Sequence, residues 1–218
     1  MRKTWSIGPM IILVATALLA AGCGGEEAPE KAAKKAADEK MPRYKKAKTP
    51  KDLVDVLHDT LVDGKTEEFM RRVSGSKEEK QVVQVLADYI AASAKFKADF
   101  VKAYGEEAWT AYRDGEGRKL KLIEEPNIDE PEVEGDEATV RQAGFGQPLK
   151  LTRQDKLWRV KAESFKPKGV KKPDVYIKMA EALTAAIRDA NAKIDPDDTR
   201  PEDIEIVVPE SMTTEEEE

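Results

Sequence analysis

The chain has 218 residues, of which 37% are charged and 40% hydrophobic, and its formal net charge at pH 7 is -6. This acidic balance argues against a nucleic acid as partner, because phosphate binding relies on a surplus of Lys and Arg. The only cysteine is Cys23 and the only histidine is His58, which excludes an internal disulfide and a zinc site built on a histidine pair. No cofactor is expected, since the sequence has no phosphate-binding loop.

The first 22 residues have the layout of a secretion signal. Arg2 and Lys3 precede an apolar run of about fifteen residues, Ile7 to Ala21, which is followed by small residues. A membrane-spanning helix needs about 20 apolar residues, more than this run contains. The motif Leu19-Ala20-Ala21-Gly22-Cys23 that closes the run resembles the lipobox of bacterial lipoproteins.

That resemblance implies cleavage before Cys23, acylation of this cysteine and anchoring of the mature protein in the cell envelope. Gly24 stands where inner-membrane lipoproteins of double-membraned bacteria carry an aspartate. The resemblance therefore favours the outer membrane, with the protein facing the periplasm or exposed at the surface. A plain cleaved signal and a retained anchor are the alternatives.

Residues 23–48 are predicted to form a flexible charged tether. Met41 is their only large aliphatic residue, so the segment buries too little apolar surface to offset the entropy of ordering. Between Glu30 and Lys51 there are nine basic residues and three acidic ones. Two interpretations stay open: contact with anionic lipid head groups, at about 1 kcal/mol per basic residue, or a solvated, extended linker.

The next part of the chain is predicted to be helical. Thr49-Pro50 caps and starts a helix, and Asp63-Gly64 ends it. A short helix is expected at about residues 65–73. The capping box from Ser76 to Glu79 opens a long third helix, which is expected to end before Gly105 and to be followed by a further helical turn.

After residue 118 the apolar pattern changes to a period of two. Alternation predicts short strands at residues 119–123, around 133, and at 138–140, 149–152 and 158–162. We expect these strands to form an antiparallel meander with one buried face. A last helix is predicted from Asp174 to about Ala192, where apolar residues recur at helical spacing.

The end of the chain is acidic, with eleven carboxylates and one base, Arg200, over residues 195–218. Such a block predicts a largely disordered tail. Asp195, Asp197 and Asp198 suggest calcium, but the glycine and the spaced glutamate of a calcium-binding loop are missing, so no metal site is predicted. Residues 204–208 are expected to form a short strand that docks on the domain.

Helices followed by an antiparallel sheet are the order of the cystatin-like cone, also called the nuclear-transport-factor-two-like fold. Residues 135–140, with the hairpin at 149–153 and 157–160, resemble the paired terminal strands of small secreted lipoproteins with that fold. The resemblance implies N-terminal helices packed on a curved antiparallel sheet. Chain length and pattern predict a single α+β domain over residues 49–194, in which the C-terminal helix is an addition to the cone. In the alternative α+β arrangement, the last helix packs directly along the third one.

A cone of this kind would enclose a cavity. Candidate residues to line it are His58, Tyr89, Phe96, Phe100 and Trp158. His58 is the candidate general base, because histidine is the residue type that most often has this role, and Asp59, Asp88 and Asp99 are carboxylate candidates. Each also has a structural interpretation: His58 lies at the margin of an apolar stripe, and the aromatic residues have the spacing of a core.

Because no catalytic motif is present downstream of the signal, we predict a lipid-anchored envelope protein with a non-catalytic binding or scaffolding domain. The alternatives are a small-ligand-binding protein or isomerase-like enzyme that uses the cone cavity, and an envelope spacer. The expected partners are the membrane, through the lipid anchor, and an envelope protein or a small apolar ligand.

Overall fold

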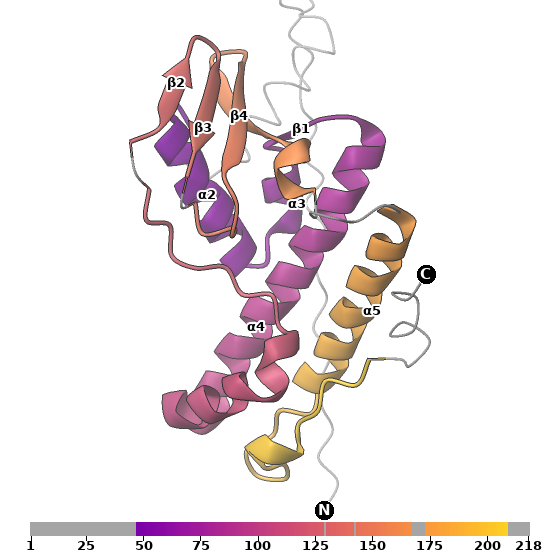
Figure 1. Ribbon diagram of the computed structural model, residues 1–218. Helices are drawn as coiled ribbons and strands as arrows, with labels where there is room; N and C mark the ends of the chain where they lie inside the picture. Colours follow the sequence, from indigo (N-terminus) through magenta and orange to yellow (C-terminus); the bar gives the residue numbers. More distant parts are fainter. Residues whose placement is uncertain (1–46, 129, 142, 167–172, 209–218) are drawn as a thin grey trace, which may run out of the picture. The chain divides into compact units, whose positions relative to one another are not determined.

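The computed structural model describes residues 47–128, 130–141, 143–166 and 173–208. They belong to one compact unit, residues 44–218, and form an α+β domain of helices, a five-stranded sheet and a C-terminal helix (Figure 1). The predicted signal, Cys23 and most of the tether lie outside the described residues. No helix in the described ranges is long and apolar enough to cross a membrane.

The helical first half agrees with the prediction. Helix α2 (Pro50–Val62) and the long helix α4 (Lys77–Asp114) both begin with a complete capping box, at Thr49 and Ser76 respectively. In each box the cap side chain accepts a hydrogen bond from the third helical amide, and the third side chain accepts one from the cap amide. Helix α3 (Thr66–Met70) is shorter than expected.

Helix α4 is interrupted once. Gly105 has φ 88° and ψ 169°, a conformation that glycine adopts without the steric cost of a side chain. The residues after it form the predicted further helical turn and bring Trp109 and Tyr112 back onto Phe100, with ring centroids 5.8 and 4.6 Å away. The glycine thus closes an aromatic cluster at this end of α4.

Four strands form the expected antiparallel meander: β2 (Glu132–Glu134), β3 (Glu137–Val140), β4 (Leu149–Gln154) and β5 (Leu157–Lys161). The prediction missed a fifth strand, β1 (Val73–Ser74), which pairs parallel with β5. The sheet is therefore mixed, in the order β1-β5-β4-β3-β2. A two-residue strand has no period of its own, so nothing in the sequence distinguished it from a turn.

The sheet has one buried face. Leu149, Leu151 and Val160 are fully buried there, with Trp158 nearly so, and they pack with α2, α3 and the first turns of α4 in a first core. The side chains between them on the strands are exposed or half-buried. This alternation is what one-sided burial of an antiparallel sheet predicts.

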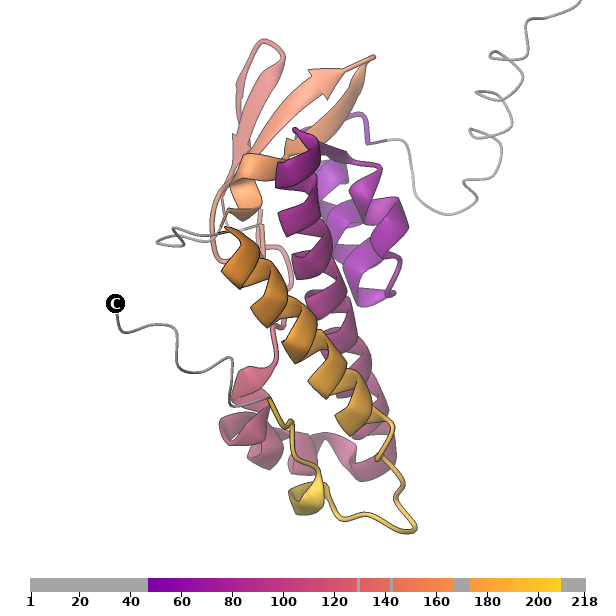
Figure 2. The same ribbon diagram turned by 90° about the vertical axis from the view of Figure 1, so that its right-hand side faces the viewer.

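A second core lies along the other half of α4. Helix α5 (Pro173–Asn191) packs beside α4 (Figure 2), burying Ile187 and Ala190 against Phe96 and Phe100. This is the alternative arrangement considered for the last helix. Two separate cores thus share one long helix.

The predicted strand at residues 119–123 is wrong. Residues Glu116–Lys119 form a 3-10 helix, and the following residues run without a strand partner. Leu120 and Leu122 pack against the second core, whereas Ile123 packs against the first. The segment crosses between the cores, and its backbone bonds to groups outside any neighbouring strand of the sheet. The amide of Lys121, for example, donates to Ser93 Oγ of α4 over 3.0 Å.

The domain also extends past the expected boundary at residue 194. Ile204 and Ile206 are fully buried in the second core, while Glu205 and Val207 between and after them are exposed. Residues 204–208 therefore dock on the domain as expected, but they form no strand. The chain is held instead by side chains: Ile206 N donates to Glu116 Oε2 over 3.1 Å, and Lys119 Nζ donates to Ile206 O over 2.8 Å.

Candidate functional site

The five side chains predicted to line a single cavity do not meet in one. Trp158 belongs to the first core, and Phe96 and Phe100 belong to the second. His58 is 7% exposed on α2, with Nδ1 3.5 Å from Asp59 Oδ1. Tyr89, half-buried beside the second core, is the one member of the set that lines a cavity described below.

The three candidate carboxylates are also apart from one another. Asp59 is exposed beside His58, and Asp88 accepts hydrogen bonds of 3.1 Å from the Gln84 amide. Asp99 accepts from Lys95 Nζ over 2.6 Å and from Asn191 Nδ2 over 2.9 Å. The hydrogen bond from Lys95 lowers the pKa of Asp99, so this carboxylate is charged at neutral pH and is a weaker base than an unpaired aspartate.

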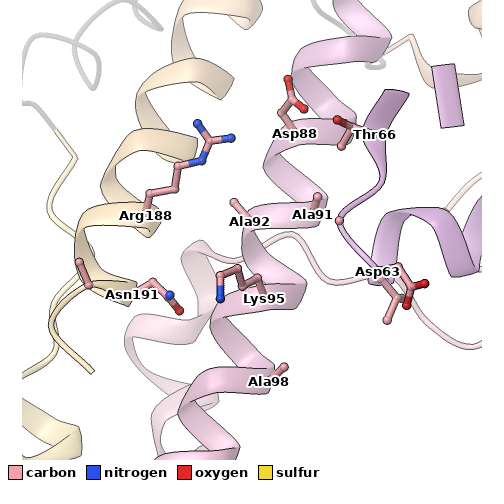
Figure 3. Close-up of a pocket in the computed structure, with 12 residues that line it drawn as sticks. Asp63, Thr66, Asp88, Ala91, Ala92, Lys95, Ala98, Arg188 and Asn191 are labelled. Carbon is pink, nitrogen blue, oxygen red and sulfur yellow. The ribbon is translucent and has the colours of Figure 1, made fainter. Parts of the chain in front are cut away.

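Asp88 and Lys95 instead border a groove on the outside of α4. Its floor is the helix surface at Ala91, Ala92 and Ala98. One wall is α5, and the other is the turn between α2 and α3 (Figure 3). The groove has a volume of about 580 Å³, and from residue 88 to residue 98 its floor is about 15 Å long, at 1.5 Å per helical residue.

The α4 sequence explains why the groove stays open. Alanines stand at positions three, four and ten residues after Asp88, so they share one side of the helix. A methyl side chain cannot bridge the space between two flanking helices. On the other side of α4 the phenylalanines fill the second core, which holds α5 close to the helix. On the alanine side Ala91 is buried, Ala92 is half-buried and Ala98 is exposed.

The two walls of the groove differ in charge. Arg188 of α5 lines one wall, and in the described part of the chain its guanidinium has no ion pair or hydrogen bond. Asp63 lines the opposite wall, where it pairs with Lys65 at 2.9 Å, and Asp88 lies above the alanines (Figure 3). The groove therefore offers a free cation on the α5 side and carboxylates on the α2 side.

The groove is lined by few nucleophilic side chains. Its described lining residues include no histidine or cysteine, and the only hydroxyl is that of Thr66. They therefore include neither the cysteine nucleophile nor the histidine base that nucleophilic catalysis often uses. Within the described ranges, no group of three or more Asp, Glu, His or Cys side chains is placed to hold a metal ion.

No family model matches the chain, and no curated protein or solved structure matches it either.

Sequence reasoning missed this groove. It followed the large apolar residues of α4, because these predict a core, and it assigned Asp88 to the cone cavity as a carboxylate candidate. The signal was present as small residues recurring along one side of α4, together with a helix-forming segment late in the chain. Only the packing of α5 and of the α2–α3 turn against α4 converts that side into a groove with two walls.

Proposed function

We propose that the chain is a bacterial lipoprotein, anchored in the envelope through acylated Cys23, whose domain is a non-catalytic module that binds a helix of a partner envelope protein. The alanine-floored groove between α5 and the α2–α3 turn is the observation that supports helix binding. The lipobox-like motif from Leu19 to Cys23 supports the lipid anchor. The outer membrane is the proposed location, because Gly24 follows the cysteine.

The floor of the groove favours a helix as its occupant. Helices approach each other to about 8 Å where the contacting side chains are small, and the alanines of α4 permit such an approach. A floor of about 15 Å matches about ten helical residues, or three turns. Recognition of an amphipathic helix in a groove is a recurring mode of protein binding.

The walls specify the charges of that helix. A carboxylate on the side facing α5 would meet the free guanidinium of Arg188, and a lysine or arginine on the other side would meet Asp63 and Asp88. Arg188 is exposed, so its pairing contributes selectivity and orientation more than affinity.

The cystatin-like cone belongs to the same proposal. What supports it is the order of the elements, helices before the antiparallel strands β2–β5, and the single buried face of the sheet. The parallel strand β1 and helix α5 are additions to that pattern. A solved structure in which β2–β5 lie flat or pair in another order would remove the relationship.

The anchor is tested by intact mass of the full chain purified from bacterial membranes. The proposal expects the mass of a chain that begins at Cys23 plus acyl groups, and a Cys23→Ser chain without them. An unmodified cysteine in the wild-type protein would refute the lipoprotein assignment while leaving the groove untouched.

The groove is tested with a photo-crosslinking amino acid at Val62, an exposed lining residue of the groove, in the full chain in cells, and at Thr152 on the outer face of the sheet as a control. We expect one crosslinked partner from position 62, with the crosslink mapped to a helix that carries a carboxylate. Adding Ala92→Leu to the chain with the probe at position 62 should abolish the crosslink, and adding Ala111→Leu, a matched change of an exposed alanine outside the groove, should not.

A charge exchange decides whether the crosslink reports the proposed contact. Arg188→Glu should weaken crosslinking, and replacing the mapped partner carboxylate by lysine should restore it. Equal crosslinking from Thr152, or an Arg188→Glu defect that no partner substitution restores, would contradict the proposal.

A further inference from the structure

A second cavity lies where the two cores meet. It is bounded by α4, the 121–124 segment, the 144–147 loop, the 3-10 helix Ala162–Phe165 and the start of α5. The cavity is lined by Leu86 and Phe165 of the first core and by Leu122 at the edge of the second core. The volume is about 480 Å³, within the range of about 300–1,000 Å³ typical of small-molecule sites.

Aromatic rings form much of the wall. Phe145 and Phe165 meet edge to face, with centroids 5.6 Å apart and an interplanar angle of 82°. Tyr89 and Tyr176 line the cavity from α4 and α5. Aromatic side chains favour aromatic partners through offset and edge-to-face contacts, worth about 0.5–1.5 kcal/mol per pair beyond burial.

Hydrogen-bonding groups line the same space. The hydroxyl of Tyr176 has no hydrogen bond in the described part of the chain, and burial raises its pKa, so it is a neutral donor at physiological pH. The Gln147 amide nitrogen donates to Ser164 O, which fixes the side chain and leaves its carbonyl oxygen as an acceptor. Lys121 and Glu124 are exposed at the rim, so the cavity opens to solvent.

The loop wall is held in place by a close backbone contact. Gly144 has φ 81°, its carbonyl accepts from Glu124 N over 3.2 Å, and a Cβ at this position would lie 2.2 Å from Glu124 O. Only glycine permits this approach. The wall is therefore formed before any ligand arrives, which reduces the ordering cost of binding.

We propose that this cavity binds a small aromatic molecule that carries one hydrogen-bonding group. The rings of Phe145, Phe165, Tyr89 and Tyr176 contact the aromatic part, and Tyr176 or Gln147 binds the polar group. This site is separate from the alanine-floored groove, with which it shares no lining residue, and it does not depend on the function proposed for the groove.

The test uses N-phenyl-1-naphthylamine, an uncharged secondary amine that joins a phenyl and a naphthyl group and whose fluorescence rises in apolar surroundings. The protein is the chain from residue 23 onward with Cys23→Ser, which avoids detergent; both cores consist of residues from Ala47 to Ile206, so this chain keeps every contact of the described domain. We expect saturable binding with one site per chain.

Two variants fill the cavity from different elements: Ile123→Trp from the crossing segment and Leu86→Phe from α4. Each should weaken probe binding at least tenfold, and Tyr176→Phe about threefold. Ala92→Leu, which fills the groove, is the matched control and should leave the affinity unchanged. Circular dichroism and the urea midpoint identify a variant that has lost its fold. If one cavity-filling variant is unfolded, probe binding by the other one tests the proposal.

Three results would overturn the proposal: no saturable fluorescence rise, undiminished binding by a folded cavity-filling variant, or loss of binding in Ala92→Leu alone. The last result would place the probe in the groove.

Discussion

Ile206→Ala should destabilise the domain strongly, although this residue lies in a stretch whose composition predicts a disordered tail. Ile206 is fully buried in the second core. Truncation to alanine removes about three methylene equivalents, or about 2.4 kcal/mol at 0.8 kcal/mol each. A residual cavity adds to this loss, and measured Ile→Ala changes in cores span about 2–5 kcal/mol.

The site cannot collapse easily around the smaller side chain. Its backbone is clamped on both sides, by Glu116 Oε2 at the amide and by Lys119 Nζ at the carbonyl. Aromatic rings also form much of the surrounding core. We therefore expect a loss of about 3 kcal/mol in the free energy of unfolding, equivalent to a fall in Tm of about 6–12 °C for a domain of this size.

The assay is urea unfolding followed by tryptophan fluorescence in a Trp158→Phe background, in which Trp109 reports on the second core. Val207→Ala is the matched control, because Val207 is 64% exposed, and it should change the free energy by less than about 0.5 kcal/mol. Equal small effects for Ile206→Ala and Val207→Ala would falsify the docking of this segment.

Three further outcomes are expected. Ser76→Ala should cost about 1 kcal/mol in urea unfolding, because it removes the cap of α4; a change below about 0.2 kcal/mol would contradict the capping box. Gly144→Ala should lower the free energy of unfolding more than Gly135→Ala does, because both glycines have positive φ but only Gly144 would place a Cβ against Glu124 O. Equal urea midpoints for the two variants would speak against that contact. Burial raises the pKa of Tyr89 to about 12, so the unfolded chain loses the hydroxyl proton at lower pH than the folded chain does. The free energy of unfolding therefore falls as the pH rises from about 10 to 12. A Tyr89→Phe domain should lose less stability over that range, and parallel pH profiles of the two proteins would refute the shift.

Local signals predicted the elements that depend on nearby residues. Thr49-Pro50 and Ser76 to Glu79 marked both helix starts, because a cap bonds to amides only two or three positions away. Gly105 marked the break in α4 through its own conformational freedom. The alternation in β4 and β5 identified the buried face of the sheet, since side chains alternate along any strand.

Tertiary structure decided what depends on distant partners. Leu120 and Leu122 alternate as in a strand, yet they lie in a segment that crosses between the two cores. Ile204 and Ile206 belong to an acidic segment, yet their side chains are buried in the second core. The aromatic residues predicted to share a cavity divide between those cores, with Trp158 in the first and Tyr89, Phe96 and Phe100 in or beside the second. The groove and the aromatic cavity exist only because α5 returns along α4 after more than fifty intervening residues. Local sequence determines which segments can be helix or strand and which side of each is apolar; which apolar sides meet, and which side is left open for a partner, depends on packing between residues far apart in the chain.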